Sequence, residues 1–208
     1  MPKPKKNRVT ARRLLAVVSL LSFLPACTGL GVAVGAGAAA GIGAYQERGL
    51  EIAARDLRME AAIIDTWIAA DHTLVTRISA EVYEGRALLT GSVADSATRT
   101  KAAKLAWKAG GITEIINEIQ VNPDSDAIDL ARDSWISAQL KTRITFDKNI
   151  SAINYAIETV NGIVYLIGIA QSTDELDRVV AYANDISYVK KVISHVRIKS
   201  GAAGTKPS

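Results

Sequence analysis

One motif occurs twice in this chain, and this repeat limits the folds that the chain can adopt. The stretch GRALLTG at Gly85–Gly91 aligns with GIVYLIG at Gly162–Gly168, an offset of 77 residues. The similarity continues at the same offset to Val121 in the first copy and Ile198 in the second. A chain built from two related units of this size is expected to fold as two small domains with the same order of elements.

The first helix of each copy is indicated by apolar residues that recur every three or four positions. We expect this apolar stripe to face the core in both copies. Its members are Leu50, Ala54, Leu57, Ala61, Ile64 and Ile68 in the first copy, and Ile136, Leu140 and Ile144 in the second. The residues DTWI at 65–68 align with DSWI at 133–136 at an offset of 68. This alignment predicts nine additional residues between the first helix and the first strand of the second copy.

Two short strands and a tight turn follow in each copy, and a second helix and a last strand complete it. We expect Gly85 and Gly162 to lie in the turns, because Asn-Gly and related pairs favour hairpins. Gly91 and Gly168 are expected to permit close approach of a helix over the sheet, or a bulge. The order αββαβ predicts an α+β fold, in which each copy has a three-stranded mixed sheet with two helices on one face.

The N-terminal residues have the features of a secretory signal. Six basic residues and no acidic residue lie in the first 13 positions, and an apolar run of about ten residues follows. The sequence Leu24-Pro25-Ala26-Cys27 then resembles the lipobox of bacterial lipoproteins, in which the Cys is lipidated. The resemblance implies that Cys27 carries acyl chains and that Thr28 after it directs the protein to the outer membrane, facing the periplasm. The alternative is a plain signal peptide beside an unmodified Cys.

Removal of this segment reverses the net charge of the chain. The 208 residues include 25 Lys and Arg against 21 Asp and Glu, a net charge of +4. Loss of the six N-terminal basic residues leaves 19 against 21, so the mature chain has a net charge of −2. A generally basic nucleic-acid-binding protein is therefore not expected.

A Gly/Ala-rich stretch, TGLGVAVGAGAAAGIGAY, connects Cys27 to the repeats. Its composition favours a flexible tether, and the alternative is a glycine-zipper helix that packs through its small residues. The predicted organisation is a signal peptide over 1–26, lipidated Cys27 and the tether over 27–49, domains over 50–121 and 132–199, an acidic linker over 122–131 and a tail over 200–208.

The repeated unit resembles the BON domain, and two stretches carry this likeness: AEVYEGRALLTGSV in the first copy and AIETVNGIVYLIGIA in the second. The lipobox, the tether and two such copies together resemble the family of dual-BON outer-membrane lipoproteins. The resemblance implies that the second copy contacts anionic phospholipid through its first helix. By position it implies Trp135, Leu140 and Arg143 as lipid-facing residues, with Lys141 as a further candidate.

Charge and aromatic residues give independent support to a membrane contact of the second copy. Residues 132–199 hold nine basic and seven acidic residues, whereas residues 50–121 hold eight and ten. Trp135 lies outside the apolar stripe of its helix, next to Arg143, which suits a bilayer interface. The alternative for Trp135 is packing between the two copies, because the alignment at offset 68 gives it Trp67 as its counterpart.

The sequence offers little for catalysis. His72 follows a predicted helix end and His195 lies on the last strand, and no nucleophile–base set, metal-ligand spacing, cofactor fingerprint or nucleic-acid motif accompanies them. We therefore expect no enzyme, no cofactor and no metal.

Three functions remain open: a lipid-anchored protein that binds anionic phospholipid and supports outer-membrane integrity, an interaction adaptor for an outer-membrane assembly or secretion machine, and a structural protein that self-associates weakly through its tether.

Overall fold

The computed structural model describes residues 46–122 and 127–200. These residues belong to one compact unit, and both copies of the repeat lie in it. Cys27, the signal peptide, the tether up to residue 45 and the tail from residue 201 lie outside the described residues, so the predictions for them stay predictions.

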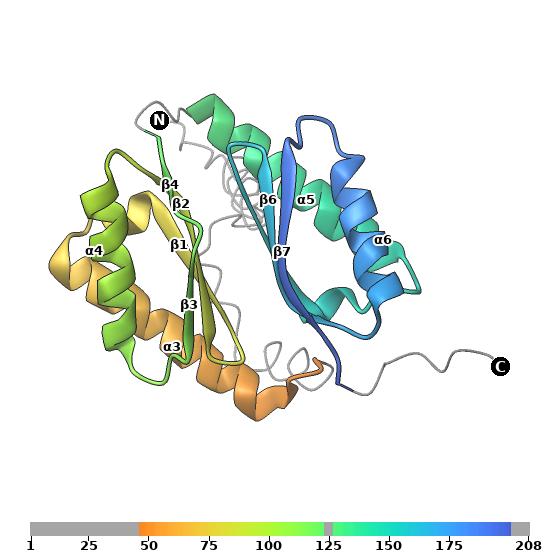
Figure 1. The fold of residues 1–208 in the computed structure, drawn as a ribbon, viewed down its shortest axis with the longest axis horizontal. Coiled ribbons are helices and arrows are strands. Elements are labelled where there is room, and N and C mark those ends of the chain that lie inside the picture. Colours follow the sequence, from red (N-terminus) through yellow and green to blue (C-terminus); the bar gives the residue numbers. More distant parts are fainter. Residues whose placement is uncertain (1–45, 123–126, 201–208) are drawn as a thin grey trace, which may run out of the picture. The chain divides into compact units, whose positions relative to one another are not determined.

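The first copy consists of a long helix, a hairpin, a second helix and a last strand in two pieces (Figure 1). Its elements are α3 (Gly49–Ala70), η2 (Leu74–Thr76), β1 (Ile78–Tyr83), β2 (Arg86–Val93), α4 (Ser96–Ala106), η3 (Trp107–Ala109), β3 (Glu114–Asn117) and β4 (Gln120–Val121). Strand β2 pairs antiparallel with β1 and parallel with both β3 and β4. Helices α3 and α4 cover the same face of this sheet (Figure 1).

The second copy repeats this arrangement with an uninterrupted last strand. Its elements are α5 (Ala127–Phe146), η4 (Ala152–Asn154), β5 (Tyr155–Val160), β6 (Ile163–Ala170), α6 (Thr173–Asn184) and β7 (Lys191–Ile198). Strand β6 pairs antiparallel with β5 and parallel with β7. The predicted α+β fold is confirmed, with a mixed sheet and two helices on one face in each copy.

The two copies match at a single offset of 77 residues along their whole length, including the first helix. Asp56 of α3 accepts hydrogen bonds from the backbone N–H groups of Glu84 and Gly85, at 2.7 and 3.0 Å. Asp133 of α5 does the same for Asn161 and Gly162. The predicted offset of 68 and the nine-residue insertion are therefore wrong, because the shared residues DTWI and DSWI occupy different turns of their helices.

In the first copy, the apolar stripe that was expected to face the core lies mostly on the exposed side of its helix. The residues that α3 buries are Asp56, Met59, Ile63 and Trp67, and three of them are apolar. The predicted stripe lies on the opposite side of the helix, and Leu50 and Ile68 remain about half exposed. Helix α3 thus carries apolar residues on two faces, and periodicity alone does not tell which of them meets the sheet.

The four glycines singled out in the sequence have two different roles. Gly85 and Gly162 follow Glu84 and Asn161 in the hairpin turns, where all four residues have positive φ angles. Gly91 faces the backbone of Arg77, and Gly168 faces the backbone of Asn154. The close approach expected at Gly91 and Gly168 therefore involves the chain that enters the neighbouring strand, and not one of the α-helices over the sheet.

Each copy has its own core between sheet and helices, and a third cluster joins the copies. This third cluster contains side chains from the helix-free faces of the sheets: Tyr83, Leu88, Ile116, Tyr165, Ile167 and Ile169. Arg86 lies at its edge and donates a hydrogen bond to the carbonyl oxygen of His195 at 2.8 Å. The two sheets therefore bury their second faces against one another, which supplies core area that a domain of this size lacks alone.

Candidate functional site: the outer face of helix α5

One side of α5 forms the core of the second copy. Ile136, Leu140 and Ile144 are almost completely buried there, and they pack in one cluster with residues of β5, β6 and α6. Leu140 has no exposed surface, so its implied contact with lipid is wrong for the folded domain. Its apolar character serves the core instead.

The outer side of the same helix presents aromatic residues to solvent. Trp135 is 43% exposed and Phe146 is 82% exposed. Phe146 lies eleven positions after Trp135, which places the two within about 20° of one another around the helix and about 16 Å apart along it. Tyr188, 65% exposed, comes from the loop before β7 and meets the Trp135 ring edge-on, with 6.3 Å between ring centroids.

Two arginines of α5 flank these aromatic rings. The guanidinium of Arg132 lies 5.2 Å from the centroid of the Tyr188 ring, and it also forms an ion pair with Asp129. Arg143 lies toward the Phe146 end and pairs with Asp185 at 2.6 Å. We call Trp135, Phe146, Tyr188, Arg132 and Arg143 the aromatic–basic face.

Two hollows lie beside this face. One, of about 200 Å³, is lined by Arg132, Tyr188 and Lys190 among other residues. The other, of about 670 Å³, is lined by Arg143, Phe146 and Lys148 among others. Lys148 and Lys190 are exposed, and neither forms an ion pair with another residue in the described parts of the chain. Each hollow therefore combines an aromatic ring with basic side chains.

A chain of backbone contacts positions Tyr188 against α5. The buried carboxylate of Asp133 accepts hydrogen bonds from the N–H groups of Asn161 and Gly162, at 2.6 and 2.8 Å. Burial raises the pKa of Asp133, while these two N–H groups oppose the shift. The carbonyl oxygen of Gly162 in turn accepts a hydrogen bond from the N–H of Lys190, which fixes the loop that carries Tyr188 with a φ of 71°.

The first copy has this scaffold but lacks the aromatic residues. Asp56 holds the turn at Gly85, and the carbonyl oxygen of Gly85 accepts a hydrogen bond from the N–H of Thr113. At the offset of 77, however, Trp135, Phe146 and Tyr188 correspond to Arg58, Ala69 and Gly111. The aromatic–basic face is thus a property of the second copy alone.

The sequence predicted only some of the residues of the aromatic–basic face. Trp135 and Arg143 lie on it, whereas Lys141 lies about 120° from Trp135 around the helix. Burial raises the pKa of Glu81 and Glu158, and the charge of Lys141 opposes this rise. Phe146 and Tyr188 were missed, although a comparison of the copies at the offset of 77 marks both as aromatic residues without an aromatic counterpart.

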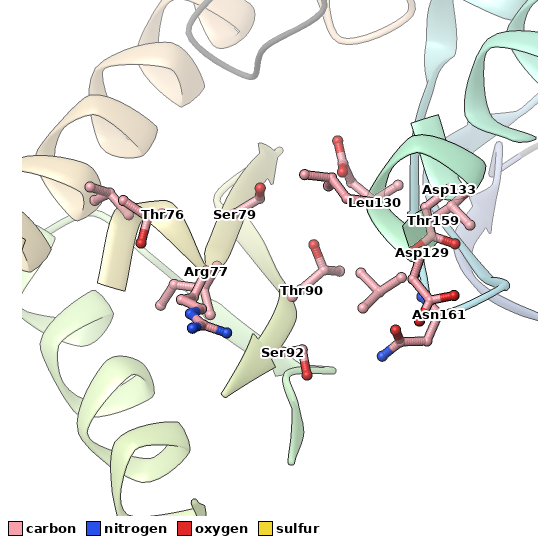
Figure 2. Close-up of a pocket in the computed structure, with 15 residues that line it drawn as sticks. Thr76, Arg77, Ser79, Thr90, Ser92, Asp129, Leu130, Asp133, Thr159 and Asn161 are labelled. Carbon is pink, nitrogen blue, oxygen red and sulfur yellow. Dashed lines mark hydrogen bonds between the residues drawn. The ribbon is translucent and has the colours of Figure 1, made fainter. Parts of the chain in front are cut away.

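A third cavity, of about 400 Å³, lies between β1 and β2 of the first copy and α5 and β5 of the second (Figure 2). Its lining is rich in short polar side chains: Thr76, Ser79, Thr90, Ser92, Asp129, Asp133, Thr159 and Asn161. Several of these already bond within the protein, as Ser92 does to the carbonyl oxygen of Asn122. No residue that lines this cavity is aromatic.

The described residues offer little else for chemistry. No cluster of three His, Cys, Asp or Glu that would suit a metal occurs in residues 46–122 and 127–200. His72 is exposed, and His195 contacts Glu118 at 3.0 Å. Among the helices in these ranges, none has the length and apolarity needed to cross a bilayer.

Comparison with known proteins agrees with this fold. An uncharacterized protein in the gshII 5′ region of Anaplasma centrale is 44% identical over 129 residues, which are 62% of this chain and 85% of that protein. The outer membrane lipoprotein DolP of Haemophilus influenzae is 35% identical over 118 residues, and a 21 kDa hemolysin of Actinobacillus pleuropneumoniae is 32% identical over 117. Each of these two matches covers 56% of this chain and 60% of the relative.

The family model of the BON domain matches residues 56–123 and 132–200. These two matches account for both copies of the repeat and confirm the expected resemblance. The chain belongs to the BON domain family, and it carries two BON domains.

Proposed function

We propose that this protein is a lipid-anchored envelope protein whose second BON domain binds anionic phospholipid at a bilayer interface and supports outer-membrane integrity. The observation that carries the proposal is the aromatic–basic face, which exists in one of two otherwise matching domains. The relation to an outer membrane lipoprotein supports the location, and lipidation of Cys27 would supply the anchor.

The composition of this face suits the boundary between lipid headgroups and acyl chains. Trp and Tyr have an apolar ring and one polar group, and they favour this boundary in membrane proteins. Basic side chains near an anionic leaflet each contribute about 1 kcal/mol. Because Arg132 and Arg143 already pair with carboxylates, Lys148 and Lys190 supply the more available charge.

Such a contact is weak by itself and suits a protein that is already held at the membrane. Two acyl chains anchor a protein stably, whereas one chain binds only marginally. The aromatic–basic face would then decide which lipids the anchored domain meets, and the acyl chains would supply most of the affinity.

The proposal is tested by flotation of the mature chain carrying Cys27→Ala with vesicles. We expect more protein to float with vesicles that contain anionic lipid than with purely zwitterionic vesicles, and added salt should weaken the difference by screening. Trp135→Glu should lower the partition coefficient about tenfold, the equivalent of about 1.4 kcal/mol.

The matched control is Trp107→Glu, because Trp107 is also exposed but lies in the first copy. It should float like the parent chain. Equal flotation on both kinds of vesicle, or equal losses in the two variants, would refute the lipid contact.

A second candidate is an adaptor that docks on an outer-membrane assembly or secretion machine. The exposed stripe of α3, with Leu50, Leu57 and Ile68 each 41–50% exposed, is the observation that favours it. A photo-crosslinker at position 57 in intact envelopes would capture a protein partner if the adaptor function holds. Capture of lipid alone would contradict it.

A further inference from the structure

The two BON domains meet through equivalent residues, as the subunits of a two-fold symmetric dimer do. Glu118 and His195 are 77 positions apart in the sequence, and their side chains contact one another at 3.0 Å. Leu88 and Tyr165 show the same relation and lie in one buried cluster. Any residue near this internal axis therefore faces its own counterpart.

This symmetry brings two glutamates together. Glu81 lies on β1 and Glu158 on β5, again 77 positions apart. Each belongs to the helix-free face of its sheet, because its strand neighbours Ala80, Val82 and Ile157 belong to the cores under the helices. Their side chains are hydrogen-bonded to one another. Two carboxyl groups form such a bond only when one of them holds a proton.

The surroundings of this pair are short of positive charge. The groups that act on it are Glu60 of α3, Lys141 of α5 and Arg48, which precedes α3. Glu158 also lines the 400 Å³ cavity together with Arg77, Asp129 and Asp133. Arg48 forms an ion pair with Asp56 at 2.7 Å, and Lys141 acts on two of the three glutamates, Glu81 and Glu158.

Burial governs the titration of this cluster. Burial and, to a smaller extent, the neighbouring Glu81 together raise the pKa of Glu158 to about 7. Burial also raises the pKa of Glu81 and raises that of Glu60 to about 8. Lys141 opposes the shifts of Glu81 and Glu158 without cancelling them.

We propose that Glu81 and Glu158 form a proton-sharing clasp that holds the two BON domains together at acidic and neutral pH and weakens their contact as the pH rises. Loss of the shared proton leaves two carboxylates side by side at the junction of the sheets, where like charges repel. The clasp belongs to the domain interface and does not depend on the lipid contact proposed above.

The sign of the pH dependence follows from proton binding. An unfolded Glu titrates near its ordinary pKa of 4.5, whereas Glu158 in the folded chain holds its proton up to about pH 7. Between these values the folded state binds more protons than the unfolded state, so its stability falls as the pH rises. Each such proton changes the unfolding equilibrium constant by up to about tenfold per pH unit.

The test is urea unfolding of the mature chain carrying Cys27→Ala, repeated from pH 5 to pH 9, a range of about four units chosen to span the shifts. In the parent chain, the unfolding constant should rise with pH. Glu158→Gln keeps a hydrogen-bond donor at the clasp but cannot ionise. The pH dependence of its unfolding constant should therefore correspond to one proton fewer than in the parent chain. At pH 9 this variant should therefore be more stable than the parent chain.

Glu81→Gln provides a second route to the same answer, because both variants remove the same shared proton. The exposed Asp177 gives the control Asp177→Asn, which should keep the slope of the parent chain. If the two Gln variants keep the parent slope, or if both are less stable than the parent at pH 9, the clasp does not exist.

Discussion

At the scale of single residues, the two copies share a small set of backbone-controlling side chains. Asp56 and Asp133 cap the hairpin turns of their own domains with nearly the same bonds. Gly91 and Gly168 occupy the strand positions where the chain entering β1 or β5 passes closest. These residues are common to both domains because the fold requires them, which separates them from the residues that serve the second domain alone.

Replacement of a close-approach glycine should destabilise the fold. A Cβ atom in Gly168→Ala would overlap the backbone of Asn154, and backbone atoms in a strand yield little. We expect a loss of about 2–3 kcal/mol in the free energy of unfolding, measured by urea unfolding. The control is Gly49→Ala, where φ is also positive but no atom lies within 4 Å. It should cost about 1 kcal/mol, and equal losses in the two variants would contradict the close approach.

At the scale of elements, the sequence predicted the order αββαβ but not the orientation of every helix. The hairpins were predictable because in each copy a two-residue turn ending in Gly separates two runs of residues that favour β-strands. The buried face of helix α3 was not predictable, because Leu57 and Ile63 are both apolar and lie on different faces of the helix. Only the sheet decides which face is buried. The alignment of DTWI with DSWI was wrong for a related reason. The two stretches are similar in sequence but occupy different turns of their helices, so Trp67 and Trp135 are not structural counterparts.

The buried face of α3 can be tested with a matched pair of truncations. Ile63→Ala removes a side chain with no exposed surface, and it should lower the free energy of unfolding by about 2–5 kcal/mol. Leu57→Ala removes a side chain that is 41% exposed, and it should cost less than about 1 kcal/mol. Thermal unfolding of both variants measures the difference. A larger loss of stability for Leu57→Ala would indicate that the face predicted from the sequence is the buried one.

At the scale of the whole molecule, the BON fold occurs twice, and the aromatic–basic face is present in the second copy and not in the first. Trp135 and Arg143 were accessible to sequence reasoning because they lie on one recognisable helix. Tyr188 was not, because it reaches α5 from a distant loop whose position depends on Asp133 and Gly162. The difference between the two domains is therefore the feature on which the proposed function rests.

The most direct measurement of the central claim is quenching of Trp fluorescence by brominated lipid in anionic vesicles. The mature chain with Cys27→Ala is compared as Trp107→Phe, which keeps Trp135, and as Trp135→Phe, which keeps Trp107. The buried Trp67 is a common background. We predict strong quenching in the chain that retains Trp135 and little in the chain that retains Trp107. Equal quenching in both chains, or none where Trp135 is present, would contradict a membrane contact through the outer face of α5.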